Sequence, residues 1–156
     1  MEKQIKEQFD AINRYIKLQN NLFQQVAAKI GISNTELYIL IFLCRSDEIC
    51  TQNDIVECWL YPKQTVSFTV NKLSNEGLVC LPPIPGTRNK KAISLTEKGV
   101  AFCQNYVAPV IEAEDTAFLA LTDNEREMFD FLVNKHYTLL NTTIRFFRYA
   151  AMHQPA

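Results

Sequence analysis

The feature that most constrains the fold is the stretch from Thr51 to Gly99, which alternates helix and strand patterns with clear breaks between them. Two segments with helical spacing of apolar residues, 51–59 and 62–76, are separated only by a short Leu-Tyr-Pro connection. Gly77 follows the second segment and can adopt the left-handed conformation with which many helices end. Two apolar segments, 78–81 and 92–95, then flank a turn rich in proline and glycine, which predicts a hairpin. The order of helix, tight connection, helix and hairpin is typical of a winged helix-turn-helix.

The second of these helices has one apolar and one polar face. Val66, Val70 and Leu73 recur at spacings of four and three residues, which predicts one buried side. Hydroxyl and amide groups such as those on the other side suit base edges and phosphates, whereas the simpler interpretation is a solvated surface. That polar face carries Lys63, Gln64, Thr65, Ser67, Thr69, Asn71 and Lys72.

Charge is segregated in the same region of the chain. Residues 62–98 hold six Lys or Arg and two acids, a net charge of +4, in a chain whose net charge is −1. Residues 1–61 carry −2 and residues 99–156 carry −3. One basic segment in an otherwise acidic chain creates a local positive potential that attracts a polyanion. This favours binding of duplex DNA by the polar face over the interpretation that this face is only solvated.

The run IVECWLYPKQTVSFTVNKLSNEGLV, followed by TRNKKAISLTEKG, resembles the MarR family of bacterial transcriptional regulators. The matching features are TVS near the start of the second helix, the L-x-x-x-G-L-V exit, and the wing pattern in which R-x-x-x-x-x-x precedes LTEKG. In the family an acidic residue usually stands two positions before the wing arginine, but Gly86 occupies that position here. Arg88 is therefore expected to lack its usual partner within the wing.

The resemblance implies that the second helix faces the major groove and that Arg88 reaches the minor groove from the wing tip. We expect Gln64, Thr65 and Ser67 to approach base edges, and lysines of the helix and wing to anchor phosphates. Two interpretations are open for Phe68: it touches a thymine methyl group, or it packs against the sheet. The complete predicted DNA-binding set is Lys63, Gln64, Thr65, Ser67, Phe68, Asn71, Lys72, Arg88, Asn89, Lys90 and Lys91.

Long amphipathic helices are predicted on both sides of this module. Apolar residues from Ile5 to Ile30 step by four and three, with Gln19 filling the one gap, close to a heptad seam that packs along another long helix. A capping box at 33–36 opens a helix that is apolar on every side and therefore buried. After the wing, Thr96 caps a helix with Phe102, Tyr106 and Val110 on one face and a kink near Pro109. A second capping box at 122–125 opens a final helix that reaches about residue 149.

The predicted fold class is mainly α with a small β wing. The predicted domains are an N-terminal dimerisation helix over 1–30, the winged helix-turn-helix over 31–99, C-terminal dimerisation helices over 100–150, and a fraying tail over 151–156. Neither flank closes a core alone, so we expect the flanks to pack together and against a second copy in a two-fold dimer, as the resemblance also implies. Two recognition helices one turn apart predict an imperfect palindrome as the operator.

Composition excludes several other classes of protein. No apolar run approaches the roughly 20 residues of a membrane span, and the first residues are too charged for a signal peptide, which predicts a cytoplasmic protein with reduced cysteines and no membrane association. None of the five cysteines forms a C-x-x-C motif and only two histidines are present, so no metal or cofactor is predicted. Cys44 and Cys103 are expected as small core residues, and His136 as a core or interfacial residue.

The sequence therefore predicts a homodimeric DNA-binding regulator, most often a repressor in the MarR family, that a small-molecule effector releases. The resemblance implies an aromatic or phenolic anion as effector. One alternative keeps DNA binding but makes Cys44, Cys50, Cys58 or Cys80 a redox sensor. Another is a winged helix that binds protein rather than DNA. An enzyme is not predicted, because no glycine-rich phosphate loop, metal-ligand pair or Ser/His/Asp set is present.

Overall fold

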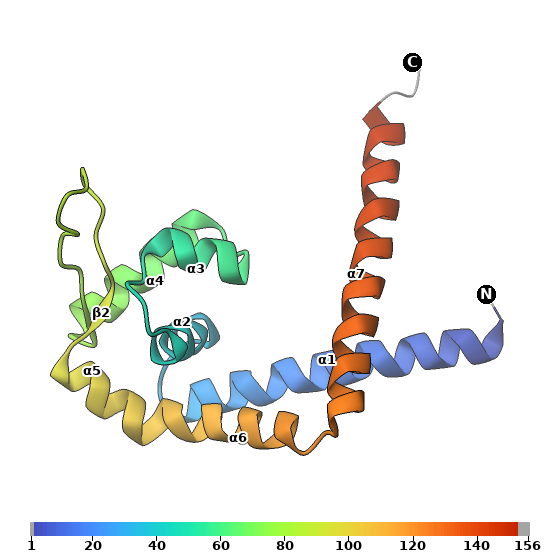
Figure 1. Cartoon of the computed structure of the whole chain (residues 1–156), viewed down its shortest axis with the longest axis horizontal. Coiled ribbons are helices and arrows are strands. Elements are labelled where there is room, and N and C mark those ends of the chain that lie inside the picture. The colour runs from blue at the N-terminus through green and yellow to red at the C-terminus, as the bar shows by residue number, and fades with distance from the viewer. Residues whose placement is uncertain (1, 153–156) are drawn as a thin grey trace. The chain divides into compact units, whose positions relative to one another are not determined.

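The computed structural model of the protein describes the backbone of residues 2–152 and the side chains of residues 2–145. The chain forms two compact units, residues 1–111 and residues 112–156, which are described separately. The fold is mainly α with one small antiparallel sheet, as predicted (Figure 1). The elements follow in the order α1 (Lys3–Lys29), α2 (Asn34–Arg45), α3 (Gln52–Trp59), α4 (Lys63–Asn75), β1 (Val79–Cys80), β2 (Ser94–Leu95), α5 (Glu97–Phe102), the π-helical segment η1 (Cys103–Val107), α6 (Ala108–Leu119) and α7 (Asp123–Met152).

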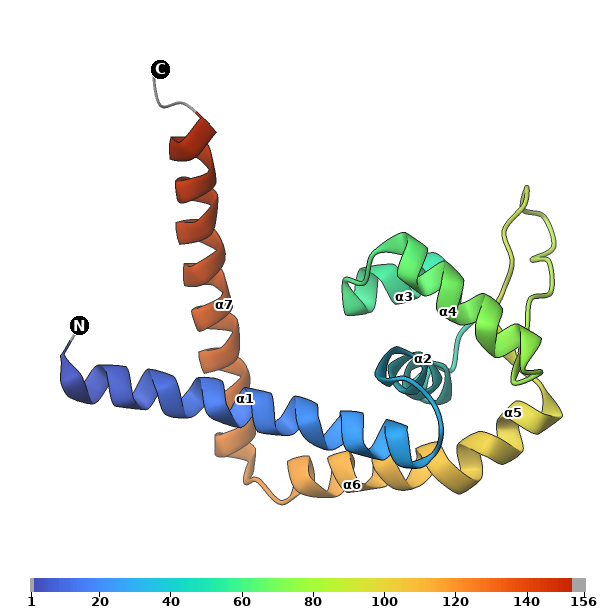
Figure 2. The same cartoon turned by 180° about the vertical axis from the view of Figure 1, so that it is seen from behind.

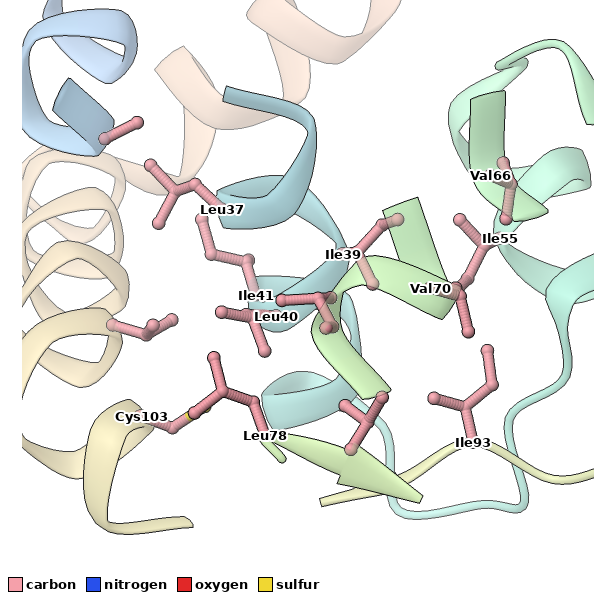
Figure 3. Packing of buried hydrophobic residues seen from close by; sticks show 14 residues of the cluster. Leu37, Ile39, Leu40, Ile41, Ile55, Val66, Val70, Leu78, Ile93 and Cys103 are labelled. Atoms are coloured by element: carbon pink, nitrogen blue, oxygen red, sulfur yellow. The ribbon is translucent and has the colours of Figure 1, made fainter. Parts of the chain in front are cut away.

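The core of the first unit is built around α2, whose apolar residues are buried on nearly every side, as predicted. Helix α4 packs on α2 and on α3, and Figure 3 shows Ile55 of α3 beside Val66 and Val70 of α4. Burial of this continuous cluster is the main favourable contribution to folding. The fully buried side chains include Leu37, Ile39, Leu40, Ile55, Val66, Val70 and Leu73, each at 0% exposure.

Side-chain caps define where the core helices begin. Ser33 accepts a hydrogen bond from the backbone N–H of Glu36, while the Glu36 carboxylate accepts one from the backbone N–H of Ser33 at 2.8 Å, which is the predicted capping box. Thr51 and Asp54 form the same reciprocal pair at the start of α3. Each box satisfies backbone donors that the first turn of a helix leaves unpaired. Pro62 is the N-cap of α4, so the helix begins at Lys63, one residue after its predicted start at Pro62.

The sheet is shorter than the sequence predicts. Val79 pairs with Leu95 and Cys80 with Ser94, and isolated bridges add Cys50 to Ile93 and Pro83 to Lys91. The bridge at Cys50 adds a third edge to the sheet, since Ile93 N–H donates to Cys50 C=O at 2.7 Å. Prolines at 82, 83 and 85 cannot donate to a ladder, which explains why the regular strands stop at two residues. Figures 1 and 2 show the connection between β1 and β2 extending away from α2, α3 and α4 as a hairpin.

The chain leaves the wing through a tight crossing at Gly99. Thr96 caps α5 by accepting from Gly99 N–H at 3.0 Å and donates to Gly77 C=O at 2.6 Å. A Cβ at position 99 would lie 1.9 Å from the backbone oxygen of Leu78, so only glycine fits there. Gly77 itself is left-handed, with φ +73°, as predicted.

The burial pattern after α5 differs from the prediction. Gly99, Cys103 and Val107 are buried, whereas Tyr106 of the predicted stripe is 48% exposed. The reason is that the helix passes through η1, whose wider turn changes the phase of the faces. Pro109 follows directly after η1, so the predicted kink takes the form of a π-helical segment before the proline.

The predicted core position of Cys44 is wrong, whereas that of Cys103 is confirmed. Cys103 is 4% exposed inside the apolar cluster, but Cys44 is exposed. Cys44 lies in the last turn of α2, where the helix reaches the edge of the core. His136 is likewise exposed within the chain, so it is not a core residue.

Helix α1 and the second unit carry large apolar side chains that remain exposed within one chain. Ile12 of α1 is 55% exposed, and Phe129 and Leu132 of α7 are 58% and 52% exposed. The predicted capping box of α7 is present, with Thr122 N–H donating to Glu125 at 2.8 Å. Helix α7 runs to residue 152, slightly beyond its predicted end, and the rest of the predicted tail lies outside the described residues.

Within residues 2–152, no single helix is both long and apolar enough to cross a membrane. Helices α1 and α2 meet that criterion only as a pair, across a bend of 92°. The apolar residues of α2 that contribute to the result are core residues of the first unit.

Candidate nucleic-acid interface

Helix α4 is held in place by its apolar face and presents its polar face outward. Val66, Val70 and Leu73 are fully buried against α2 and α3, so the rotation of the helix about its axis is fixed. Thr69, which the sequence placed on the polar face, is 5% exposed. Its hydroxyl donates to the Thr65 carbonyl at 2.8 Å, which satisfies the buried group.

The exposed face of α4 is a ridge of amide and aromatic side chains. Gln64, Phe68 and Asn71 are exposed, while Thr65 and Ser67 are half-buried beside them. Phe68 is 73% exposed, so it does not pack against the sheet. The other interpretation, contact with a thymine methyl group, stays a prediction. Amides at these positions can exchange paired hydrogen bonds with a base edge, and an aromatic ring can touch a thymine methyl group. Lys63 stands exposed at the first turn, where a cation can meet a phosphate.

Lys72 is engaged within the protein rather than free on the ridge. Its ammonium lies 2.9 Å from both carboxylate oxygens of Glu36 and 3.7 Å from Glu76. Glu36 is 1% exposed, whereas Lys72 is nearly half exposed. The pair therefore ties the last turn of α4 to the first turn of α2.

The titration of this ion pair follows from its surroundings. Burial acts to raise the pKa of Glu36, but hydrogen bonds from Ser33 and Lys72 outweigh it and hold that pKa below its usual range. The hydrogen bond to Glu36 raises the pKa of Lys72. Both groups are therefore charged at neutral pH, and Lys72 positions α4 rather than offering a free cation.

Glu36 is the residue of this region that the sequence interpretation did not single out. The signal was present: a capping glutamate at the third position of a helix that is apolar on every side must itself be buried. A buried carboxylate needs a cation, and Lys72 is the cation that the fold supplies.

The wing tip presents its cations without partners among the described residues. Arg88, Asn89, Lys90 and Lys91 are all exposed, and the tip is closed by Ile84 N–H donating to Lys90 C=O at 3.0 Å. Gly86 and Asn89 adopt left-handed conformations, with φ +76° and +65°, which glycine and asparagine tolerate best. No ion pair joins Arg88 to another described residue, in agreement with the missing acidic residue at position 86.

The base of the wing faces α3 across an open pocket of about 460 Å³. Lys90 and Lys91 line one side and the carboxylates of Asp54 and Glu57 line the other. These acids reduce the positive potential at the two lysines. Arg88 lies farther out and is not part of the pocket lining.

The described side chains contain no cluster of three or more His, Cys, Asp or Glu residues that could hold a metal ion. What they do contain is a helix with a fixed buried face and a polar exposed face, beside a basic hairpin. This arrangement is the winged helix-turn-helix, a DNA-binding class of fold.

Comparisons with known proteins agree with this class. A family model described as the MarR family matches residues 30–88. A MarR family regulator from Neisseria meningitidis, NMB1585, is 25% identical, with 88% of this chain and 96% of that chain covered and a TM-score of 0.70. AbsC, a MarR family transcriptional regulator from Streptomyces coelicolor, is 16% identical, with coverages of 91% and 97% and a TM-score of 0.74.

A third similar structure is a complex of MepR from Staphylococcus aureus with DNA, at 22% identity, coverages of 85% and 97%, and a TM-score of 0.67. No curated protein sequence matches the chain. The predicted resemblance to the MarR family is confirmed by the family match and by the fold. The winged helix-turn-helix of this chain is accordingly similar to that of MarR family transcriptional regulators.

Proposed function

We propose that this protein is a transcriptional regulator of the MarR type, a homodimeric repressor that reads a palindromic operator through α4 and the basic wing. The observation that carries the proposal is the ridge of Gln64, Phe68 and Asn71, which is exposed while the opposite face of the same helix is fully buried. A rigid helix with outward amides can make base contacts of defined geometry. The exposed lysines and Arg88 add sequence-independent attraction to phosphates.

The assignment of roles follows the geometry. Gln64, Phe68 and Asn71 contact base edges, with Thr65 and Ser67 at the margin of the ridge. Lys63 and the wing residues Asn89, Lys90 and Lys91 contact phosphates, and Arg88 enters the minor groove. Lys72 acts through its ion pair with Glu36, because its ammonium is already engaged. MepR, which shares the fold, has been solved in complex with DNA, and this supports duplex DNA rather than a protein as the ligand.

The exposed apolar side chains of α1 and α7 support dimerisation. Ile5, Phe9, Ile12 and Ile16 lie four, three and four residues apart on α1, and each is about half exposed in the single chain. Contiguous exposed apolar surface on this scale marks an interface, and long helices with such stripes pack against one another. A two-fold dimer would present two copies of α4 to successive major grooves.

We further propose that a small-molecule effector, of the aromatic-anion class that the resemblance implies, releases the operator. The first unit contains an aromatic stack that links α1 to α3: ring centroids are 5.4 Å apart for Phe23 and Tyr38, and 4.8 Å apart for Tyr38 and Trp59. Movement of α1 would therefore reach the helix that precedes α4. Because both half-sites must be engaged together, a modest change in spacing is enough to lower affinity.

The test is a selection of random DNA duplexes on the purified protein. The proposal predicts enrichment of one palindromic sequence with half-sites about one helical turn apart, bound by two chains of 18.0 kDa each. Addition of salicylate as a probe of the aromatic-anion class is expected to weaken binding to that duplex. Weak binding without sequence preference would contradict the proposal and would favour the alternative in which the winged helix binds a protein.

A further inference from the structure

The connection between α3 and α4 contains a leucine in an unfavourable position. Leu60 follows the last residue of α3 and adopts the left-handed conformation, with φ 54° and ψ 26°. Among the described residues other than glycine, Leu60 and Asn89 are the two with a positive φ, and asparagine tolerates this conformation far better than leucine does. Leu60 is also 80% exposed, the highest value of any large apolar side chain in the described part of the chain. The residue therefore combines a strained backbone with an apolar side chain in water.

The fold explains the backbone conformation of this residue but not the choice of leucine. Trp59 and Tyr61, on either side, are half-buried against the apolar cluster, and Trp59 stacks on Tyr38 with ring centroids 4.8 Å apart. Because both neighbours are held against the core, the residue between them is turned outward. Glycine or asparagine would adopt the left-handed conformation at lower cost, and neither would expose apolar surface. The fold gains little from the Leu60 side chain, and strain of this kind persists where a function requires it.

Leu60 lies next to the part of α4 for which DNA contacts are proposed. Three Cα–Cα steps of about 3.8 Å each keep Leu60 within roughly 11 Å of Lys63, the first residue of α4. Lys63 and Gln64 are exposed, so the proposed contacts with a phosphate and a base edge lie at this end of the helix. In a helix-turn-helix the first helix crosses the DNA backbone and the beginning of the second enters the major groove. The turn that joins the two helices therefore lies at the edge of the groove.

We propose that Leu60 is a specificity-determining residue that contacts the C5-methyl group of a thymine in each half-site. An aliphatic side chain can neither donate nor accept a hydrogen bond, and the thymine methyl is the apolar group that base pairs present in the major groove. Contact between the two removes apolar surface of both partners from water. The inference rests on the proposed function, because it requires that α4 reads duplex DNA.

The contact expected for Leu60 is distinct from the contact expected for Phe68, which is 73% exposed. Phe68 is five residues beyond Lys63, about 7.5 Å farther along the axis of α4 at 1.5 Å per residue, whereas Leu60 precedes the helix. The two apolar side chains therefore lie on opposite sides of Gln64 along the chain and meet different base pairs. Each enriched half-site should accordingly contain two thymines whose methyl groups contribute to affinity.

The first experiment removes single methyl groups from the DNA and leaves the full chain unmodified. In the duplex that the chain enriches, each thymine is replaced in turn by uracil, in both half-sites together, and affinity is measured by fluorescence anisotropy. Uracil keeps every hydrogen-bonding group of thymine and lacks only the methyl group. One buried methyl group contributes about fourfold to affinity, so the replacement in both half-sites should weaken binding roughly 15-fold. We expect two sensitive positions in each half-site.

Variants assign each sensitive position to a side chain. Leu60→Gly should bind the thymine duplex roughly 15-fold more weakly than the unmodified chain, and uracil at one of the two positions should weaken it no further. Phe68→Ala should lose its sensitivity at the other position only. Leu119→Ala, which changes a 70% exposed leucine of the second unit, is the matched control and should keep both sensitive positions. Leu60→Gly should not lower the melting temperature, because glycine adopts the left-handed conformation readily.

The outcomes separate the role of Leu60 from the proposed function. A selection of duplexes that enriches no sequence would contradict both. An enriched sequence that Leu60→Gly binds with full affinity, or with the same uracil sensitivities as the unmodified chain, would overturn the role of Leu60 alone. A Leu60→Gly chain that melts at a lower temperature, or that sediments as a monomer where the unmodified chain is a dimer, would show instead that the side chain serves the fold or a subunit contact.

Discussion

The winged-helix core and the flanking helices bury their apolar residues to very different degrees. In α2, Leu37, Ile39 and Leu40 are completely buried within one chain. In α1, Ile12 and Ile16 remain 55% and 52% exposed although they recur at the same helical spacing. The second unit, considered by itself, also leaves large apolar side chains exposed: more than half of Phe129 and of Leu132 is accessible.

This contrast separates two kinds of hydrophobic pattern. The core pattern is satisfied within one chain by α2, α3, α4, the small sheet, η1 and the end of α1, so it specifies a fold. The flanking pattern finds no cover within its own unit, and the proposed dimer would supply that cover. The comparison leads us to expect that mutations in the core change the stability of the chain, whereas mutations in the flanks change its oligomeric state.

Truncation of a core leucine should have the largest effect on stability. Leu40→Ala removes a fully buried side chain and should lower the free energy of unfolding by about 2–5 kcal/mol, through lost burial and the cavity that remains. The matched change in the flank is Ile12→Ala. This variant should lower the measured stability only by weakening the association of two chains. Urea unfolding at two protein concentrations distinguishes the two variants. A decrease in the free energy of unfolding of Ile12→Ala that does not depend on protein concentration would contradict the contrast between core and flank.

Charges introduced into the α1 stripe should abolish the dimer without unfolding the core. Ile12→Asp combined with Ile16→Asp is expected to halve the mass measured by sedimentation equilibrium to that of one 18.0 kDa chain. The helical circular dichroism signal of the winged-helix unit should persist, and operator affinity should fall on the order of 100-fold because the second half-site no longer contributes. The control is Lys3→Ala, at an exposed residue of the same helix. A dimer that survives both substitutions would exclude this stripe as the interface.

Loss of the Glu36–Lys72 ion pair should have an intermediate effect on stability. Glu36→Gln removes the charge that faces Lys72 but keeps the size of the side chain, and should cost about 1–3 kcal/mol at neutral pH. Glu76→Gln is the matched control, because Glu76 is exposed and 3.7 Å from Lys72, and exposed pairs contribute little.

The pH dependence of this contribution has a defined sign. The pKa of Glu36 is lowered in the folded protein, so its stabilisation is complete above the pKa of an unfolded glutamate, about 4.3. It is lost as the pH falls through the lower folded-state pKa. The free energy of unfolding of Glu36→Gln should therefore decline less than that of the unmodified chain below about pH 4. Parallel declines in the two proteins would contradict the assigned role.

The smallest predicted effect concerns the wing. Arg88→Ala and Lys91→Ala should each weaken operator binding and reduce the slope of log affinity against log salt by about 1. Arg88 should matter more than Lys91, because Lys91 shares a pocket with Asp54 and Glu57. Lys135→Ala, in the second unit, is the control and should leave the slope unchanged. Unaltered slopes for both wing variants would show that the wing does not touch phosphates.

Local features of the fold could be predicted from the sequence because they depend on neighbouring residues. The capping boxes at Ser33 and Thr122, the left-handed Gly77 and the buried face of α4 all rest on spacings of two to eight residues. Propensity and periodicity act at that range, and the structure confirms them. The polar ridge of α4 could be predicted for the same reason, although its contacts with DNA remain a prediction.

Features that depend on distant contacts could not be predicted. The place of Lys72 on the polar face predicts a phosphate contact, but its partner Glu36 stands 36 residues earlier. The apolar neighbours of Cys44 predict a core position, but the folded chain leaves the last turn of α2 at the edge of the core and Cys44 exposed. Pro109 predicts an irregularity in this helix, and the π-helical segment η1 lies directly before it. The sequence did not reveal that this wider turn rotates the buried face of the residues around it.

The central claim is that the exposed ridge of α4 reads base sequence while the wing supplies affinity. The most direct test repeats the selection of random duplexes with Gln64→Ala and with Lys91→Ala. The account predicts that Gln64→Ala changes the preferred base at one position in each half-site, and that Lys91→Ala enriches the same sequence as the unmodified chain with lower affinity. An identical enriched sequence for Gln64→Ala, together with full affinity, would contradict the assignment of α4 as the helix that reads DNA.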